Sequence, residues 1–155
     1  MTLLLESDEL RTESNRPAIT STSSSGVDVL QLDHHDRLVQ ALLRVGQLRS
    51  LEEDWNSYGS PPPSERLIQV VEAFIESSDH FFRPFLPAPH TVPVPGGGIK
   101  LAWLNGEREL ELELGPIEDG HMPIEYLRVS HGEPIAEGPV TGTALVEHLT
   151  WVIRG

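Results

Sequence analysis

The segment Ile99–Leu114 constrains the fold of this chain more than any other. Hydrophobic and polar residues alternate on both sides of Asn105-Gly106, the dipeptide that most favours a two-residue β-hairpin turn. The predicted cross-strand pairs are Leu101 with Leu110, Ile99 with Leu112, Trp103 with Arg108, and Lys100 with Glu111. In this register the apolar side chains of these pairs lie on one face, and a slip of one residue would reverse the faces.

The second strand of this hairpin carries a ladder of carboxylates. Alternate residues of a strand project to the same side, about 6.8 Å apart. The ladder consists of Glu107, Glu109, Glu111 and Glu113. We interpret it as a docking strip for a basic partner or as a weak cation site, and the alternative is the solvated face of a strand whose other face is leucine.

Helical patterns flank the hairpin. We expect a first helix from Asp33, its N-cap, to about Glu53, and a second helix over Glu65–Phe82 capped by Ser64. The proline-rich segment Trp55–Pro63 separates the two, because its prolines cannot continue a helix.

Short strand patterns complete the expected fold. The remaining predicted elements are an edge strand at Thr91–Val94, a strand at Met122–Val129, a further strand near Pro134–Ala136, and a last helix after Thr141 or Thr143. The sequence therefore predicts an α+β fold with two N-terminal helices, a three- or four-stranded antiparallel sheet and a C-terminal helix.

The beginning of the chain differs from the rest. Residues 1–26 end in the polar run TSTSSSG, so we expect a flexible tail there, followed by a single α+β domain over residues 27–155. The apolar run Leu3–Leu5 is too short for a signal peptide, and no stretch is long enough to span a membrane. We expect a cytoplasmic protein.

Charge narrows the classes of partner. The chain has 24 acidic residues against 11 Lys and Arg, a formal net charge of −13. Such a field repels nucleic acids and anionic membranes, and it favours either a basic partner or solubility alone. The absence of cysteine excludes disulfides, thiol catalysis and cysteine-ligated metals.

No cofactor or metal site is expected. Asp33-His34-His35-Asp36 contains metal-ligating residue types, but only the two aspartates have the spacing that places ligands on one helix face. Gly96-Gly97-Gly98 precedes a strand, whereas phosphate-binding glycine loops precede a helix.

Aromatic and nucleophilic residues supply the other candidate sites. Trp55 and Tyr58 lie on an irregular segment and are candidate anchors for a partner, although Trp55 is also suited to cover the core. A small hydrolase or ligand-binding site is the alternative function, and it requires the fold to gather four residues near the sheet. These are His90, His121, Ser130 and His131.

Several segments together resemble a loose family of small uncharacterised bacterial proteins. The segments are DWNSYGSPPPSE, PHTVPVPGGGIKLAW, ELELEL and IEYL, within Asp54–Leu127. The resemblance implies a link to mobile-element or toxin–antitoxin-like loci, and it implies no catalytic residues. The charge, the ladder and the lack of a convincing active site in the sequence together favour a non-enzymatic module, accessory or antitoxin-like, that binds a basic surface of a cognate protein.

Overall fold

The computed structural model describes residues 26–155, with side chains from Asp33 onward. The chain divides into two compact units, residues 1–35 and residues 36–155. The predicted flexible tail, residues 1–26, lies outside the described residues except for Gly26, which is helical.

The first helix, α3, spans Gly26–Gln47 and continues into a 3-10 turn, η1, at Leu48–Ser50. The predicted N-cap at Asp33 is therefore wrong, because Asp33 lies inside the helix. Residues 27–32 contain no proline or glycine that would interrupt a helix. The helix therefore begins before Asp33, although Asp33 is a good capping residue.

The second helix, α4, spans Glu65–Phe82, as predicted. The Ser64 hydroxyl accepts a hydrogen bond from the Leu67 amide at 3.1 Å, which satisfies one of the unpaired donors of the first turn. This boundary depends on residues within one helical turn, which explains why the sequence predicted it.

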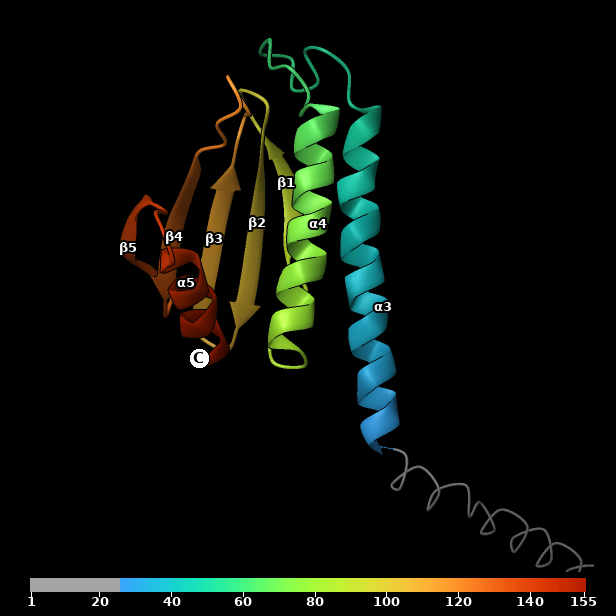
Figure 1. The fold of residues 1–155 in the computed structure, drawn as a ribbon, viewed down its shortest axis with the longest axis vertical. Coiled ribbons are helices and arrows are strands. Elements are labelled where there is room, and N and C mark those ends of the chain that lie inside the picture. The colour runs from blue at the N-terminus through green and yellow to red at the C-terminus, as the bar shows by residue number, and fades with distance from the viewer. Residues whose placement is uncertain (1–25) are drawn as a thin grey trace, which may run out of the picture. The chain divides into compact units, whose positions relative to one another are not determined.

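Helices α3 and α4 lie side by side and antiparallel over the part of α3 that follows His35 (Figure 1). Arg49 in η1 joins them. Its Nε donates to Glu65 Oε1 at 2.9 Å, and its Nη2 donates to Glu72 Oε1 at 2.7 Å. The hydrogen bonds from Arg49 to Glu72 and Glu65 raise the pKa of the guanidinium, so it stays charged.

An antiparallel meander of five strands, in the order β1-β2-β3-β4-β5, forms the sheet. The strands are β1 His90–Val94, β2 Gly98–Asn105, β3 Arg108–Leu114, β4 Ile124–Ser130 and β5 Glu133–Pro139. The predicted antiparallel sheet is confirmed, but three or four strands was an underestimate. Both edge strands contain proline, which edge positions allow.

The hairpin register differs from the prediction by two residues. Asn105 pairs with Arg108, so Gly106 and Glu107 form the turn. The φ of Gly106 is positive, which suits the first central position of a type II′ turn. Asn105 stays in the strand because its Nδ2 donates to the carbonyls of Val152 and Ile153, at 3.0 Å each.

A shift of two residues leaves every side chain on its predicted face. The observed Cα partners are Ile99 with Leu114, Lys100 with Glu113, Leu101 with Leu112, and Trp103 with Leu110. The prediction that Trp103 opposes Arg108 is wrong. Lys100 still reaches Glu111 diagonally, with Nζ and Oε2 3.1 Å apart.

The last helix, α5, spans Ala144–Ile153 and packs with α4 on one face of the sheet (Figure 1). Residues of α3, α4, α5 and the inward face of the strands share one hydrophobic core. The fully buried members include Val45, Leu67, Val71, Ile99, Leu101, Leu110, Leu112, Leu114 and Val152. From residue 26 on, none of the helices has the length and hydrophobicity needed to cross a membrane.

Candidate functional site

The outward face of the sheet is the largest candidate surface. The helices of residues 36–155 pack against the other face, so no element of that unit covers this one. The outward carboxylates come from three adjacent strands, β3, β4 and β5. They are Glu109, Glu111, Glu113, Glu125 and Glu137.

The predicted ladder is partly recovered on this face. Glu109, Glu111 and Glu113 project outward from β3 and alternate with buried leucines. Glu107 lies in the β2–β3 turn instead, beyond the end of the strand. Because β3 is the central strand of the sheet, the ladder lies in the middle of the outward face and not along an edge.

Charge on the outward face is poorly balanced. Glu113 on β3 is the direct Cα partner of Glu125 on β4, so two carboxylates face each other across the strands. Lys100 pairs with Glu111, and no other Lys or Arg of β1–β5 lies on this face. Like charges directly opposite each other destabilise a sheet, typically by up to about 1 kcal/mol.

Hydrophobic side chains lie among these carboxylates. Leu104 is 57% exposed at the end of β2, and Val92 on β1 is also exposed. Leu127 and Val129 of β4 are half-buried on the same face. The outward face therefore combines exposed apolar side chains with carboxylates.

The aromatic candidates Trp55 and Tyr58 have different environments. Trp55 Nε1 donates to the Pro61 carbonyl at 3.1 Å and its ring is half-buried, so it holds the connector together. Tyr58 is 90% exposed. Of the two rings, that of Tyr58 is therefore the one accessible to a partner.

The connector that presents Tyr58 is preorganised. Asn56 Oδ1 accepts from the amides of Tyr58 and Ser60, at 3.0 and 3.3 Å, and Asp54 Oδ1 accepts from the Gly59 amide. Asp54 has a positive φ, and these hydrogen bonds hold it in that conformation. A preorganised loop loses little conformational entropy when it binds.

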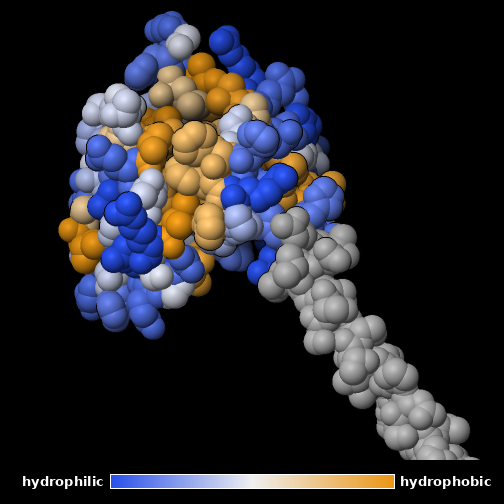
Figure 2. Space-filling model, turned by 60° about the horizontal axis from the view of Figure 1, so that its bottom comes forward, coloured by the Kyte–Doolittle hydropathy of each residue, from blue (hydrophilic) through white to orange (hydrophobic). Residues whose placement is uncertain are grey.

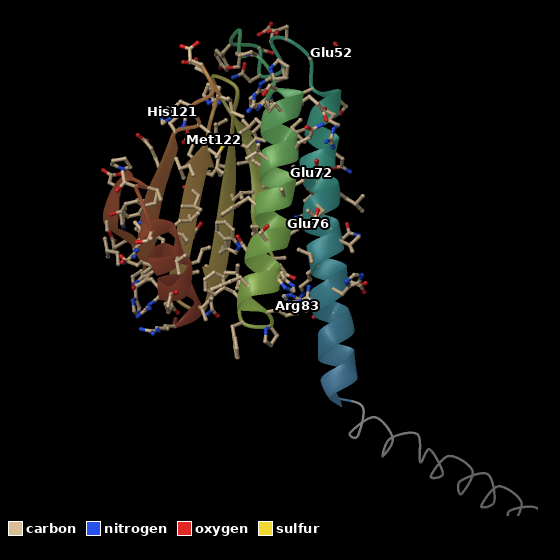
Figure 3. All side chains as sticks on the ribbon, in the orientation of Figure 1. Glu52, Glu72, Glu76, Arg83, His121 and Met122 are labelled. Atoms are coloured by element: carbon tan, nitrogen blue, oxygen red, sulfur yellow. The ribbon has the colours of Figure 1, made fainter. Side chains whose placement is uncertain are left out.

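The four residues of the alternative hydrolase site do not come together. Figure 3 shows His121 near the end at which β4 begins, and His131 follows the other end of that strand. The whole length of β4 separates the two imidazoles, which is far beyond hydrogen-bonding distance. His90 lies on β1, separated from β4 by β2 and β3.

Ser130 and His131 do form a pair, with Oγ and Nδ1 3.1 Å apart. Ser130 is the last residue of β4, and His131 lies in the exposed β4–β5 turn. Within residues 33–155, the His131 imidazole has no second hydrogen-bond partner that would orient it, as a nucleophile–base pair requires; the only other bond of His131 is from its backbone amide to the Glu107 carbonyl. No group of three metal-ligating residues occurs in the described part of the chain, which includes Asp33-His34-His35-Asp36.

The end of α4 exposes hydrophobic surface as well. Phe81 is 73% exposed and Phe85 69%, whereas Phe82 packs against the core. Figure 2 turns this end of the molecule forward and shows hydrophobic surface bordered by hydrophilic residues. The Phe81 ring packs edge-on against the Phe82 ring, with centroids 4.8 Å apart, but most of the surface of Phe81 and of Phe85 stays exposed among residues 33–155.

Sequence reasoning missed a cluster on the inward face, between β3, β4 and α5. The Cζ atoms of Arg108 and Arg128 each lie 5.0 Å from the centroid of the Trp151 ring. Arg128 Nε donates to His148 Nδ1 at 3.0 Å, and the His148 ring stacks on Tyr126 at 3.8 Å. The pattern RELELEL marked Arg108 as inward-facing, but no local signal pointed to Trp151.

Burial lowers the pKa of His148, and the neighbouring Arg128 lowers it further, while Glu147 acts in the opposite direction. His148 is only 6% exposed, so the neutral imidazole is the form that fits this site. The neutral ring can accept the hydrogen bond from Arg128, which a protonated Nδ1 could not do.

Comparisons with known proteins identify no relative: no family model, no curated protein and no solved structure matches this chain.

Proposed function

We propose that this chain is a non-enzymatic protein–protein interaction module whose outward sheet face binds a basic surface of a cognate protein. The observation that carries the proposal is the pair Glu113–Glu125, two glutamates that are direct Cα partners on a face that no element of residues 36–155 covers. The accessory or antitoxin-like role rests on the resemblance of Asp54–Leu127 described above.

The unbalanced charge supports binding over plain solubility. Solubility needs carboxylates spread over the surface, and it does not need two of them in direct opposition on neighbouring strands. A basic partner would turn this repulsion into attraction on binding, because its cations would lie between the two carboxylates. The cost in stability of the free protein would then be a consequence of function.

Apolar and aromatic groups would supply the rest of the binding free energy. Leu104 and Val92 are exposed on the outward face, and their burial would contribute about 25 cal/mol for each Å² removed from water. Tyr58 belongs to a separate exposed site on the connector. The charge of the face disfavours nucleic acid and anionic membranes as the partner.

A capture experiment with a matched control tests this proposal. The wild-type chain, the double variant Glu113→Gln/Glu125→Gln and the control Glu76→Gln/Glu118→Gln are immobilised and exposed to the extract of the native host. Both variants lose the same charge, but only the first changes the outward face, since Glu76 and Glu118 are exposed elsewhere. Binding is compared at about 50 mM and about 500 mM salt.

We expect a basic protein that is captured by the wild-type and control chains at low salt and about tenfold less by the face variant. High salt should release it, because screening weakens exposed charges. Equal capture by the two variants would contradict the proposal, since net charge alone would then explain the binding.

A further inference from the structure

The inward cluster contains two arginines that no carboxylate neutralises. Arg108 on β3 and Arg128 on β4 lie on the same face of the sheet and are diagonal neighbours. Arg108 Nη1 donates to the Trp151 carbonyl at 2.7 Å, and Arg128 Nε donates to His148 Nδ1. Among residues 33–155, neither guanidinium forms an ion pair.

Arg108 and Arg128 differ from the other described arginines that lack an ion pair, because those residues, Arg44, Arg66 and Arg154, are exposed. Arg49, Arg83 and Lys100 all have a carboxylate within 3.1 Å. Arg108 and Arg128 are half-buried, and a half-buried charge without a counter-ion is costly. Two such charges beside each other also repel, so the site favours an anion between them.

The geometry of the cluster is already fixed. The Trp151 ring lies 5.0 Å from both guanidinium carbons, and the Tyr126 ring lies 6.0 Å from that of Arg128. Each arginine uses only one N–H group for its hydrogen bond, so most of its donors stay available. Planar, preorganised guanidinium groups match the oxygens of carboxylate and phosphate groups.

We propose that Arg108 and Arg128, held by Trp151, form a binding site for an oxyanion, either a carboxylate or a phosphate group. The anion would accept hydrogen bonds from both guanidiniums and replace the missing counter-ion. Glu147 is the nearby carboxylate that acts on His148, and it bonds to neither arginine. It would limit the affinity by repulsion.

This site is independent of the proposed function. It lies on the inward face of β3 and β4, whereas the proposed protein interface is the outward face of the same strands. The two proposals need ligands of opposite charge. Failure of either experiment therefore leaves the other proposal standing.

Titration with small anions tests the site. Sodium phosphate and sodium acetate are added separately to the 15N-labelled chain at constant ionic strength, set with sodium chloride. We expect saturable shifts in the Trp151 side-chain N–H signal and in the amide signals near residues 108 and 128. Shifts with phosphate alone or acetate alone identify the class of anion, and saturation with both identifies a general oxyanion site.

Variants locate the binding. Arg128→Gln and Arg108→Gln should each weaken it about tenfold, because each loses charge-assisted hydrogen bonds. Arg66→Gln, which removes an exposed charge on α4, should leave it unchanged. If Arg128→Gln unfolds the chain, Arg128→Lys keeps the charge and loses the planar donor fork, so it should still weaken binding. Absence of saturable shifts, or equal effects of Arg66→Gln and Arg128→Gln, would overturn the proposal.

Discussion

The two faces of strands β3 and β4 differ in everything except their backbone. The outward face carries Glu109, Glu113 and Glu125, is covered by no element of residues 36–155, and contains glutamates in direct opposition. The inward face carries leucines along most of its length and ends in Arg108 and Arg128, which pack on an aromatic ring. Alternation along the strands has thus placed acid and base on opposite sides of one backbone layer.

This difference shows that one strand pair can serve two purposes. The inward residues stabilise the fold, because they remove apolar surface from water and anchor α5. Apart from the Lys100–Glu111 ion pair, the outward carboxylates do not, since repulsion such as that between Glu113 and Glu125 opposes folding. Substitutions at neighbouring positions of one strand should therefore have unequal effects on stability.

The largest effect is expected at Leu112. Leu112→Ala should lower the free energy of unfolding by about 2–5 kcal/mol, because it leaves a cavity in the core. Its sequence neighbour provides the control: Glu111→Ala removes only a partly exposed ion pair and should cost about 1 kcal/mol or less. Urea denaturation measures both, and similar losses would mean that the two faces are not distinct.

A smaller loss is expected at the base-rich end of the inward face. Trp151→Leu keeps an apolar side chain on α5 but removes the ring that both guanidiniums contact. It should cost about 0.5–1 kcal/mol for each lost cation–π contact. Tyr58→Leu changes an exposed ring of the connector and should change stability little. The thermal midpoints of the two variants give the comparison, and a neutral Trp151→Leu would show that the ring does not hold the arginines.

The same cluster should make stability depend on pH. The pKa of His148 is lowered in the folded state, so the unfolded chain binds the proton more readily. The stability that neutral His148 contributes should be present above the ordinary histidine pKa of about 6.5 and be lost as pH falls through and below it. His148→Gln should flatten the dependence of unfolding free energy on pH between about pH 7 and 5, and an unchanged slope would contradict the burial of a neutral imidazole.

The smallest effect has the opposite sign and concerns the outward face. Glu125→Lys replaces a like-charge pair with Glu113 by an attractive one and should stabilise the fold by about 0.2–1 kcal/mol. The gain should shrink in about 1 M salt, where exposed charges are screened. Denaturation at both salt concentrations tests this, and a loss of stability would mean that Glu125 has a structural role.

Elements defined within a few residues were predictable. Ser64 caps α4 because its hydroxyl accepts a hydrogen bond from the amide three positions along the chain. The prolines directly before Ser64 prevent the helix from starting earlier. The start of α3 was not predictable from Asp33. A residue that can cap a helix can also lie inside one, and the residues on both sides of Asp33 are helical. The predicted register of the hairpin was wrong because of a tertiary contact. Asn105 donates hydrogen bonds to two carbonyls of α5 and therefore stays in the strand.

The candidate sites follow the same division. Exposure of Glu109, Glu111 and Glu113 on the outward face followed from alternation with leucine, but the opposition of Glu113 to Glu125 required the pairing of β3 with β4. Tyr58 and Trp55 are both aromatic residues of the same connector, so the sequence does not distinguish their roles. In the structure Trp55 donates a hydrogen bond to Pro61, whereas Tyr58 is exposed.

The sequence by itself determined on which face of the sheet each side chain of the hairpin lies. Side chains alternate along a strand, and a shift of two residues preserves the faces. It could not determine which residues from distant segments meet, since Arg108, Arg128 and Trp151 are brought together by the packing of α5 on the sheet. That packing depends on the shape of the whole core and on no local pattern.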